Sequence, residues 1–396
     1  MNSFSSNILS RKIFGRRQTL LGLGGLAGIG ASVIGTELNK QYKLRQIQRD
    51  SQNRNFKVTS NTALGQRAAT KGLIYGAAVR QYALSSDTKL AESVVYECKM
   101  IVPEWELKWN YLRPTPTSFN FAPADWLADF SRRNGLLFRG HTLVWHEALP
   151  IWFPKTINSK NARQLLLEHI TTVVKHYAGH IHSWDVVNEA IDPRDRRSDG
   201  LKNTPWLQFI GQDYIEIAFS AAAESDPNTL LVYNDYGLQY DTHEHEAKRN
   251  AVLKLLENLK SKDIPIHALG IQSHLSGYET RFNPDKFKKF LSEVASLGLK
   301  ILITEMDVAD NKLPSDIKFR DPIVAGVYED YLSVALEEPA VISVLTWGLS
   351  DSYTWLSQNK PRKDQATVRT LPLDTQMRRK LAWNAIARAF DKATKR

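Results

Sequence analysis

The stretch KILITEMD, residues 300–307, joins an apolar, β-branched run to a pair of carboxylates. Such a run predicts a strand that is buried on both faces, as in a parallel sheet covered by helices. Seven other runs along the chain have a similar length and composition. The eight predicted strands are residues 73–79, 97–102, 136–141, 183–187, 230–234, 268–272, 300–304 and 341–347.

Helical patterns separate the predicted strands, with apolar residues recurring every three or four positions. The clearest of them are residues 161–177, 206–224, 244–260, 284–297 and 324–336. Because most strands start about 30 to 50 residues apart, each repeat has the length of a strand, a helix and a loop. The chain is therefore predicted to be an α/β protein, with residues 73–396 forming one (β/α)8 TIM barrel domain.

A doubly wound open sheet is the alternative fold for alternating strands and helices. That fold predicts a glycine-rich phosphate-binding turn after the first strand. The sequence at this place is Tyr75-Gly76-Ala77-Ala78, which lacks the glycine pattern of such a turn. The barrel is therefore the favoured prediction.

The charge of the chain is concentrated at its amino end. The 396 residues carry a net charge of +10, and residues 1–72 hold twelve basic and two acidic residues, which leaves 40 of each in the remainder. A neutral body lacks the basic surface that binds a phosphate backbone, so we expect no nucleic-acid partner. The content of 42% hydrophobic and 24% charged residues also argues against a disordered chain and a polytopic membrane protein.

Residues 1–36 resemble a bacterial twin-arginine export signal. Their paired arginines, in GRRQTLL (residues 15–21), precede an uncharged, glycine-rich apolar run up to Thr36. This order is typical of signals that the twin-arginine export machinery recognises. The run is also long enough to serve as an uncleaved N-terminal membrane anchor. We expect a protein exported by a bacterial cell (periplasmic, secreted or anchored outside the cytoplasm), with residues 37–72 as a basic polar spacer.

Glutamates end two of the predicted strands. Glu189 follows the strand at residues 183–187, and Glu305 follows the strand at residues 300–304. One such glutamate could simply mark the end of a buried strand. The carboxyl ends of barrel strands converge on one face, however, and glycoside hydrolysis needs two carboxyl groups in one cleft. One protonates the leaving oxygen, and the other attacks or stabilises the sugar carbon.

The other strand ends carry groups that bind sugars. Aromatic rings stack on the apolar faces of a pyranose, and amides, carboxylates and lysine bind its hydroxyl groups. A single Trp is more often part of a core, but together these residues predict a sugar-binding groove. They are Glu104, Lys108, His141, Trp145, Asn188, Tyr236, Gln272, His274, Asp307, Trp347 and Trp355.

Six motifs follow one another along residues 73–390. They are Glu104…Lys108-Trp109, RGHTLVWH (139–146), WDVVNEA (184–190), GIQSH (270–274), ITEMD (303–307) and TWG (346–348). In this order they resemble the motifs of glycoside hydrolase family 10, the endo-β-1,4-xylanases. The resemblance implies an endo-acting, retaining hydrolase that cleaves internal β-1,4-xylosidic bonds of xylan by double displacement. It implies no cofactor and no metal, and we expect a monomer.

By that resemblance Glu189 is the acid/base and Glu305 is the nucleophile. A retaining enzyme holds these two groups about 5–5.5 Å apart, close enough for one to raise the pKa of the other. The resemblance also implies that His274, oriented by Asp307, keeps Glu305 ionised, and that Asn188 contacts the 2-hydroxyl of the sugar being cleaved. Further family positions match Lys108, His141, Trp145, Gln272 and Trp347 around the same sugar, Glu104 at the next sugar outward, and Tyr236 on the leaving-group side.

Two departures from the family pattern fall at the subsite for the second sugar. Trp105 stands where Asn is common, and Glu147-Ala148 stands where Ser-Gln is common. Each lost amide hydrogen bond weakens binding by about 0.5–1.5 kcal/mol. We hypothesise that Ala148 leaves open space beside the second ring, so that a substituted xylose or a glucose fits there.

Two other functions stay open from the sequence. A hydrolase of β-1,4-glucan or of a mixed polysaccharide could use the same residues. A non-catalytic polysaccharide-binding protein of the cell surface could keep the groove without turnover. The presence of both Glu189 and Glu305 argues against the second of these functions.

Overall fold

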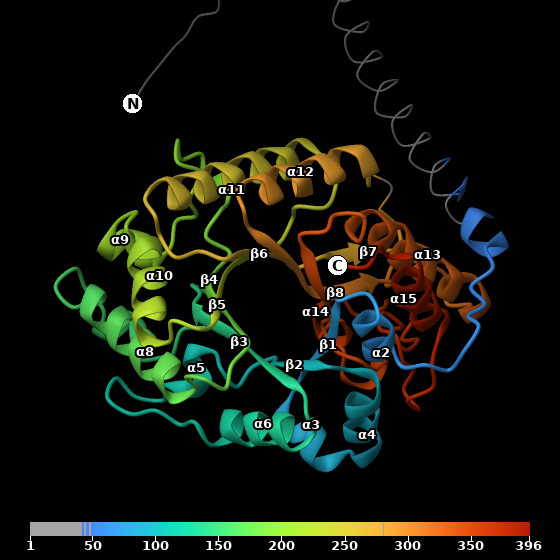
Figure 1. The fold of residues 1–396 in the computed structure, drawn as a ribbon, viewed down its shortest axis with the longest axis horizontal. Helices are drawn as coiled ribbons and strands as arrows, with labels where there is room; N and C mark the ends of the chain where they lie inside the picture. The colour runs from blue at the N-terminus through green and yellow to red at the C-terminus, as the bar shows by residue number, and fades with distance from the viewer. Residues whose placement is uncertain (1–41, 43–44, 47–48, 280) are drawn as a thin grey trace, which may run out of the picture. The chain divides into compact units, whose positions relative to one another are not determined.

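Eight parallel strands form a closed ring inside a layer of helices in the computed structural model of the chain, which describes residues 42, 45–46, 49–279 and 281–396 (Figure 1). Neighbouring strands pair in the order β1-β2-β3-β4-β5-β6-β8-β9, and β9 pairs with β1. The predicted (β/α)8 barrel is thereby confirmed. The ring consists of β1 (Ile74–Val79), β2 (Met100–Pro103), β3 (Leu137–Val144), β4 (Ser183–Asn188), β5 (Leu230–Asp235), β6 (Ala268–Ile271), β8 (Lys300–Ala309) and β9 (Val341–Thr346).

Three strands of the ring differ from the prediction by more than one residue at an end. Strand β3 continues to Val144 rather than to residue 141, and β8 continues to Ala309 rather than to residue 304. The second strand begins at Met100 rather than at residue 97, because helix α4 (Thr88–Glu97) continues up to Cys98, which is buried at the end of that helix. A short additional strand, β7 (His274–Ser276), lies beyond the ring and pairs with the end of β8. Three residues are too few to show a strand pattern in the sequence. This pairing places His274 opposite Asp307.

Helices cover the outside of the ring. Those predicted at residues 161–177, 244–260 and 284–297 are found within one residue at each end. The helix predicted at residues 206–224 is instead two helices, and the first of them ends at Gly211, whose φ is 95°. The helices are α2 (Leu64–Ala69), α3 (Gln81–Ser86), α4, α5 (Trp109–Leu112), α6 (Ala122–Arg133), α7 (Phe153–Thr156), α8 (Ala162–His176), α9 (Pro205–Ile210), α10 (Tyr214–Ser225), α11 (His243–Ser261), α12 (Pro284–Ser296), α13 (Ile317–Ala335), α14 (Leu356–Asn359) and α15 (Leu381–Lys392), with 3-10 turns at Pro193–Asp195 and Asp351–Tyr353.

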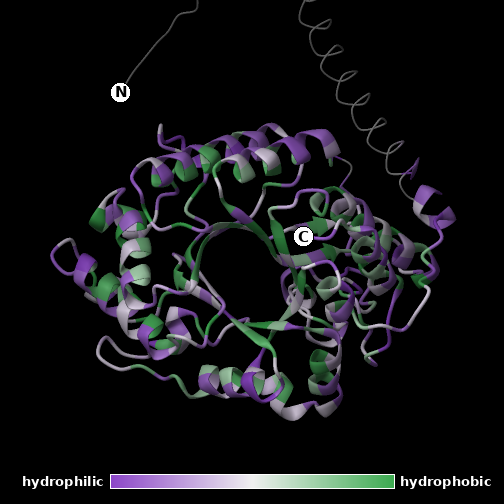
Figure 2. Ribbon diagram, viewed as in Figure 1, coloured by the Kyte–Doolittle hydropathy of each residue, from purple (hydrophilic) through white to green (hydrophobic). Residues whose placement is uncertain are grey.

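The strands of the ring are buried on both faces. Figure 2 shows hydrophobic residues along the ring, whereas the surrounding helices carry both hydrophobic and hydrophilic residues. Every residue of β4 is buried, and so is every residue of β8 except the first. This double burial explains why the strands stand out in the sequence as apolar runs. Among the residues that the structure describes, no helix has both the length and the apolar character needed to span a membrane.

Residues 50–72, which the sequence assigns to the spacer, belong to the same compact unit as the barrel. Phe56 is buried in the core. Arg67 of α2 forms an ion pair with Asp391 of α15 at 2.5 Å. The packed body therefore begins at Asp50, before the first strand.

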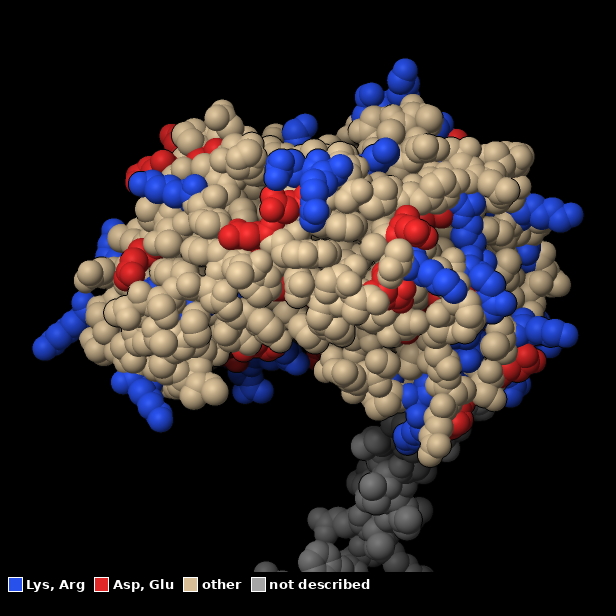
Figure 3. All heavy atoms as spheres, turned by 90° about the horizontal axis from the view of Figure 1, so that it is seen from below, with Lys and Arg blue, Asp and Glu red and all other residues tan. Residues whose placement is uncertain are grey.

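Charged side chains of both signs are scattered among uncharged residues on the face shown in Figure 3. This distribution agrees with the equal numbers of basic and acidic residues after residue 72. The basic excess belongs to residues 1–72. The predicted export signal, residues 1–36, lies outside the described residues.

The carboxyl end of the chain lies against the amino ends of the strands. The backbone N–H of Arg396 donates to the carbonyl of Lys71, just before β1, at 2.8 Å. The guanidinium of Arg396 donates to the carbonyl of Val341, the first residue of β9, at 2.9 Å. The carboxyl ends of the strands, which carry the predicted site, are therefore at the opposite end of the barrel.

Candidate active site

The carboxyl ends of the strands surround a cavity of about 740 Å³. All predicted site residues except Asp307 line it, and Asp307 lies behind His274. The barrel thus brings together side chains that are up to 251 residues apart in the sequence, because they lie in or just after the carboxyl-terminal parts of its strands. The predicted residues at the cavity are Glu104, Lys108, His141, Trp145, Asn188, Glu189, Tyr236, Gln272, His274, Glu305, Trp347 and Trp355.

Glu189 has a backbone conformation that is rare for a residue with a side chain. It follows Asn188, the last residue of β4, and its φ of 59° lies in the left-handed region. Such a conformation costs about 1–3 kcal/mol and persists where the surrounding structure fixes it. The backbone N–H of Glu189 donates to the carbonyl of Asn234 at 2.9 Å, which holds this turn against β5. Strained residues of this kind cluster at functional sites.

The carboxyl group of Glu189 is set to hold a proton. Its Oε1 accepts hydrogen bonds from Gln272 Nε2 at 2.9 Å and from Asn188 Nδ2 at 3.2 Å. Burial raises the pKa of Glu189, and the negative charges of Asp235 and Glu305 add to this effect against the hydrogen bond from Gln272. A raised pKa is what a general acid needs near neutral pH.

The carboxyl group of Glu305 is set to stay ionised. Its Oε1 accepts from Asn234 Nδ2 at 2.8 Å, and its Oε2 lies 3.3 Å from His274 Nε2. Burial opposes its ionisation, but the hydrogen bond from His274 and the charges of His141, His274 and Lys108 together lower the pKa of Glu305 to about 2. An ionised, buried carboxylate facing a cavity can act as a nucleophile.

His274 lies between two carboxylates. Its Nδ1 lies 3.1 Å from Asp307 Oδ1, and its other ring nitrogen faces Glu305. Burial would lower the pKa of His274, but Asp307 and Glu305 raise it to about 10. The other oxygen of Asp307 accepts from Trp355 Nε1 at 2.7 Å, which fixes the orientation of the pair. A charged imidazole donates from both nitrogens and so stabilises Glu305 as an anion.

Asn234, which the sequence did not single out as a site residue, connects the two glutamates. Its Nδ2 donates to Asn188 Oδ1 at 2.9 Å as well as to Glu305. Gln272 Nε2 reaches the same Asn188 oxygen at 3.3 Å and also binds Glu189. A network of side-chain amides therefore links the acid and the nucleophile. Asn234 lies at the end of β5, so its position after an apolar run was the available signal.

His141 and Lys108 add positive or donor groups beside Glu305. His141 Nδ1 lies 3.0 Å from Asp185 Oδ2 and 4.0 Å from Glu305 Oε1. Lys108 lies with its Nζ 4.9 Å from the centre of the Trp145 ring. Burial lowers the pKa of Lys108, while Glu305, Glu104 and Glu189 act in the opposite direction. Aromatic rings and polar donors thus line the same cavity.

Tyr236 lines the predicted leaving-group side of the cavity. The Nζ of Lys248 lies 3.4 Å from the centre of its ring and 2.7 Å from Asp235 Oδ1. Lys202 Nζ lies 5.7 Å from the same ring. Cations over the ring face hold Tyr236 in place.

The opposite side of the cavity differs from the family pattern, as the sequence indicated. Arg80 binds both oxygens of Glu104, at 2.5 and 2.8 Å, and both side chains are buried. Trp105 lines the cavity next to this ion pair. Ala148, for which we expected open space, is itself buried and does not line the cavity. The space expected at Ala148 is therefore not part of this cavity.

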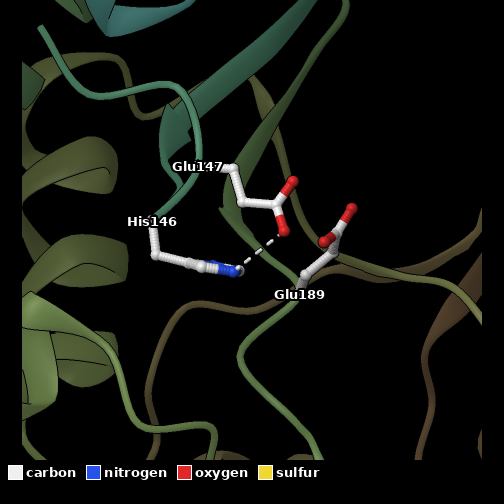
Figure 4. Close-up of side chains that lie close together, drawn as sticks. All are labelled: His146, Glu147 and Glu189. Carbon is white, nitrogen blue, oxygen red and sulfur yellow. Dashed lines mark ion pairs between the residues drawn. The ribbon is translucent and has the colours of Figure 1, made fainter. Parts of the chain in front are cut away.

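Glu147, which belongs to one of the two departures from the family pattern, lies close to Glu189. Donor atoms of His146, Glu147 and Glu189 lie within 4.8 Å of one another, and Figure 4 shows the two glutamates on the same side of His146. His146 Nε2 lies 3.5 Å from Glu147 Oε1. These are metal-ligand types, but Glu189 already accepts two hydrogen bonds. A cation here would therefore compete with proton donation by Glu189.

The sequence matches one family over most of its length. The model of Glycosyl hydrolase family 10 matches residues 63–389. Endo-1,4-beta-xylanase B of Thermotoga neapolitana is 36% identical over 276 residues, which cover 69% of this chain and 77% of that protein. A beta-1,4-xylanase of Dictyoglomus thermophilum is 37% identical over 269 residues, covering 65% of this chain and 72% of that protein.

Solved structures resemble this fold closely. Native xylanase 10B from Thermotoga maritima matches with a TM-score of 0.76 at 32% identity, covering 83% of this chain and 98% of that one. Xylanase 10B from Thermotoga petrophila RKU-1 in complex with xylobiose matches with a TM-score of 0.76 at 31% identity, covering 85% of this chain and 99% of that one.

Proposed function

The chain belongs to glycosyl hydrolase family 10, and we propose that it cleaves xylan as a retaining endo-1,4-β-xylanase with Glu189 as acid/base and Glu305 as nucleophile. The xylanase relatives and the family support the activity. The roles of the two glutamates rest on their surroundings in the cavity, which shift the pKa values of the two carboxyl groups in opposite directions. The relatives give no support to a non-catalytic binding protein, and they favour xylan over β-1,4-glucan as the substrate.

The opposite pKa shifts of the two carboxyl groups carry the assignment. Glu189 has a raised pKa and Glu305 a lowered one, although both are buried in the same cavity. A pair of titratable groups whose surroundings separate their pKa values in this way identifies the acid and the base.

Double displacement follows from this assignment. In the first step Glu305 attacks the anomeric carbon, the glycosidic C–O bond breaks, and the proton of Glu189 passes to the leaving oxygen. In the second step Glu189, now ionised, takes a proton from water, which displaces Glu305 from the sugar. Each step inverts the anomeric carbon, so the product retains the β configuration. The amide of Asn188, held by Asn234 and Gln272, faces the same space.

Reducing-sugar release from soluble xylan tests the catalytic roles. Glu305→Ala should lower the rate by about a thousandfold or more, because no other ionised carboxylate replaces the nucleophile. Glu257→Ala, on the exposed side of α11, is the matched control and should leave the rate unchanged. An unchanged rate in Glu305→Ala rules out the assigned nucleophile.

Glu189→Ala separates the acid from the nucleophile. A 2,4-dinitrophenyl leaving group departs without a proton, whereas a sugar does not. The variant should therefore lose about a hundredfold or more of its rate on xylan while bond cleavage in a 2,4-dinitrophenyl xylobioside is little affected. Equal losses on both substrates contradict the acid role.

We further propose that the protein is exported, on the basis of the paired Arg16-Arg17 and the apolar run that follows. The substitution of both arginines by lysine keeps the charge but removes the pair that the export machinery recognises. In a bacterial host the variant should accumulate in the cytoplasm at the full length of the chain. Equal export of both forms contradicts the proposal. The size of the exported form distinguishes a cleaved signal from an anchor.

We also propose that the enzyme works as a monomer, because one chain supplies all residues around the cavity. Light scattering coupled to size exclusion should give a mass near the 45.0 kDa of a single chain. A dimer mass at assay concentrations contradicts this proposal.

A further inference from the structure

Three aromatic side chains form a row at the edge of the catalytic cavity, and we call them the aromatic shelf: Tyr82, Trp105 and Tyr111. The rings of Tyr82 and Trp105 are 6.0 Å apart between centres and inclined by 27°. Those of Trp105 and Tyr111 are 5.8 Å apart and inclined by 16°. Each tyrosine ring is therefore stacked against the Trp105 ring at an inclination below 30°.

The shelf is held in place before any ligand arrives. The guanidinium of Arg80 lies 4.0 Å from the centre of the Trp105 ring and also donates to Tyr82 Oη at 3.2 Å. Below it, buried Glu106 accepts from the backbone N–H groups of Gln81 at 2.6 Å and of Trp105 at 3.2 Å. These bonds tie the loop after β1 to the loop after β2. Ordering of the shelf therefore costs little on binding.

The shelf continues the catalytic cavity toward the surface. Trp105 lines the cavity together with Arg80 and Glu104. Tyr82 and Tyr111 do not line it and are 48% and 44% exposed, although large aromatic residues are mostly buried elsewhere in the described chain. Two exposed rings that stack against a residue of the cavity lining offer apolar surface to the part of a substrate that extends out of the cavity past Trp105.

The charge at the shelf points to an uncharged occupant. The guanidinium of Arg80 is neutralised by both oxygens of Glu104, at 2.5 and 2.8 Å. The rings therefore present apolar surface next to a compensated ion pair. A pyranose has the matching chemistry, with an apolar face for stacking and neutral hydroxyl groups for hydrogen bonds.

We propose that the aromatic shelf binds the sugars of the β-1,4-linked chain that lie beyond the second sugar on the non-reducing side of the cleaved bond. This inference rests on the proposed function, since Glu104 marks the second sugar only if the cavity cleaves such chains. The shelf makes the enzyme favour longer substrates. Trp105, in place of an amide, joins the cavity to the shelf.

Two aryl glycosides of different length test the aromatic shelf. The quantity compared is the kcat/KM for nitrophenol release from 4-nitrophenyl β-xylotetraoside, divided by that from 4-nitrophenyl β-xylobioside. The bioside ends at the second sugar, whereas the tetraoside reaches the shelf. This ratio should fall about fivefold in Tyr82→Ala or Tyr111→Ala and about tenfold or more in the double variant, because each substitution removes one stacking surface. Tyr96→Ala removes a 57% exposed tyrosine on α4 and should leave the ratio unchanged.

The bioside rate also reports whether each variant is folded. An unchanged ratio in the double variant overturns the shelf. Absence of bioside hydrolysis in the unsubstituted enzyme contradicts the proposed function instead. Calorimetric titration with xylobiose and xylotetraose gives a second measurement, made with the inactive variant Glu305→Gln. When Tyr82→Ala and Tyr111→Ala are added to this variant, xylotetraose binding should weaken about tenfold more than xylobiose binding. Equal weakening of both overturns the shelf.

Discussion

Glu189 and Glu305 are the same residue type in one buried cavity, yet their pKa values are shifted in opposite directions. Glu189 is surrounded by other acids and accepts from neutral amides. Glu305 faces His274 and Lys108. Burial alone would raise the pKa of both carboxyl groups. The difference between the two pKa values therefore comes from the charges and donors within a few ångströms of each carboxyl group.

His274→Gln should move the acid side of the pH profile upward. Glu305 must be ionised to attack, so activity is lost as the pH falls through its pKa of about 2. A neutral amide at position 274 offers a hydrogen bond but no positive charge, and burial then raises the pKa of Glu305 toward or above the ordinary carboxyl value of about 4.3. Measurement of kcat/KM between pH 3 and pH 8 on an aryl xylobioside shows the shift.

His176→Gln is the control for this substitution. His176 pairs with Asp125 at 2.8 Å on the surface, on α8, and does not line the cavity. Its substitution should leave the acid limb in place. An acid limb that stays in place in His274→Gln as well would mean that the imidazole does not control the nucleophile.

Glu147→Gln should move the alkaline side of the pH profile to lower pH. Glu189 must carry a proton, so activity is lost as the pH rises through its raised pKa. The groups facing it include the negative Asp235 and Glu305 and the positive Lys202, and Glu147 adds a further negative charge. Removal of that charge favours ionisation of Glu189.

Measurement of kcat/KM against pH on Glu147→Gln and on the control Glu257→Gln tests this prediction. Glu257 is exposed on α11. The control should keep the profile of the unsubstituted enzyme. An alkaline limb that stays in place, or moves upward, shows that Glu147 does not act on Glu189.

The positions of site residues could be predicted where a strand end made them visible, whereas the division of roles between the two glutamates came from the family resemblance. Glu189 and Glu305 each follow an apolar run, and that position alone placed them at one face of the barrel. Asn234 also follows an apolar run, but an amide in that position has no single chemical meaning, so its hydrogen bonds to Asn188 and Glu305 become visible only in the folded structure. Glu147 lies in a loop, where no pattern shows which way a side chain points.

The structure differs from the sequence prediction mainly at the ends of helices and strands. Helix α4 runs up to Glu97, three residues after the buried Val94, and only two residues separate it from β2. Gly211 ends α9 in the middle of what the apolar period shows as one helix. Helical and strand patterns overlap over such short stretches, so tertiary contacts decide the boundary.

Glu97 shows what fixes the end of α4. Its buried carboxylate accepts from the backbone N–H of Leu64 at 3.0 Å, from Arg379 Nε at 2.7 Å and from Trp383 Nε1 at 3.0 Å. It therefore joins α4 to the start of α2 and to α15. Glu97→Ala should lower the free energy of unfolding by about 3 kcal/mol, because three donors lose their common acceptor.

Urea denaturation measures this loss. Glu92→Ala, at an exposed position on the same helix, should change the free energy of unfolding by less than about 0.5 kcal/mol. A loss in Glu97→Ala no larger than in the control would show that the three elements do not depend on this carboxylate.

The compact unit that contains the barrel begins earlier in the chain than the first strand. Residues 50–72 are polar and basic, so their composition predicts a spacer, yet they bury Phe56 and pair Arg67 with Asp391. Single buried or ion-paired residues of this kind do not form a periodic pattern. The start of the compact unit was therefore not visible in the sequence. The barrel itself was visible because its eight strands repeat the same pattern.

Two shortened chains test this boundary. A chain that starts at Asp50 keeps every contact of the compact unit and should melt within about 2 °C of the full chain. A chain that starts at Leu73 loses α2, including the Arg67–Asp391 ion pair, and should melt about 5 °C lower or more. Differential scanning calorimetry gives both values, and equal melting of the two shortened chains would contradict the boundary at residue 50.

The position of Arg396 has a practical meaning for how this enzyme can be attached to something else. Its hydrogen bonds to Lys71 and Val341 place Arg396 at the end of the barrel opposite the active-site cavity. A fusion partner, a bead or an electrode coupled through that terminus would therefore leave the entrance unobstructed for a long, insoluble polymer. Coupling through surface lysines around the rim would lack this directional advantage.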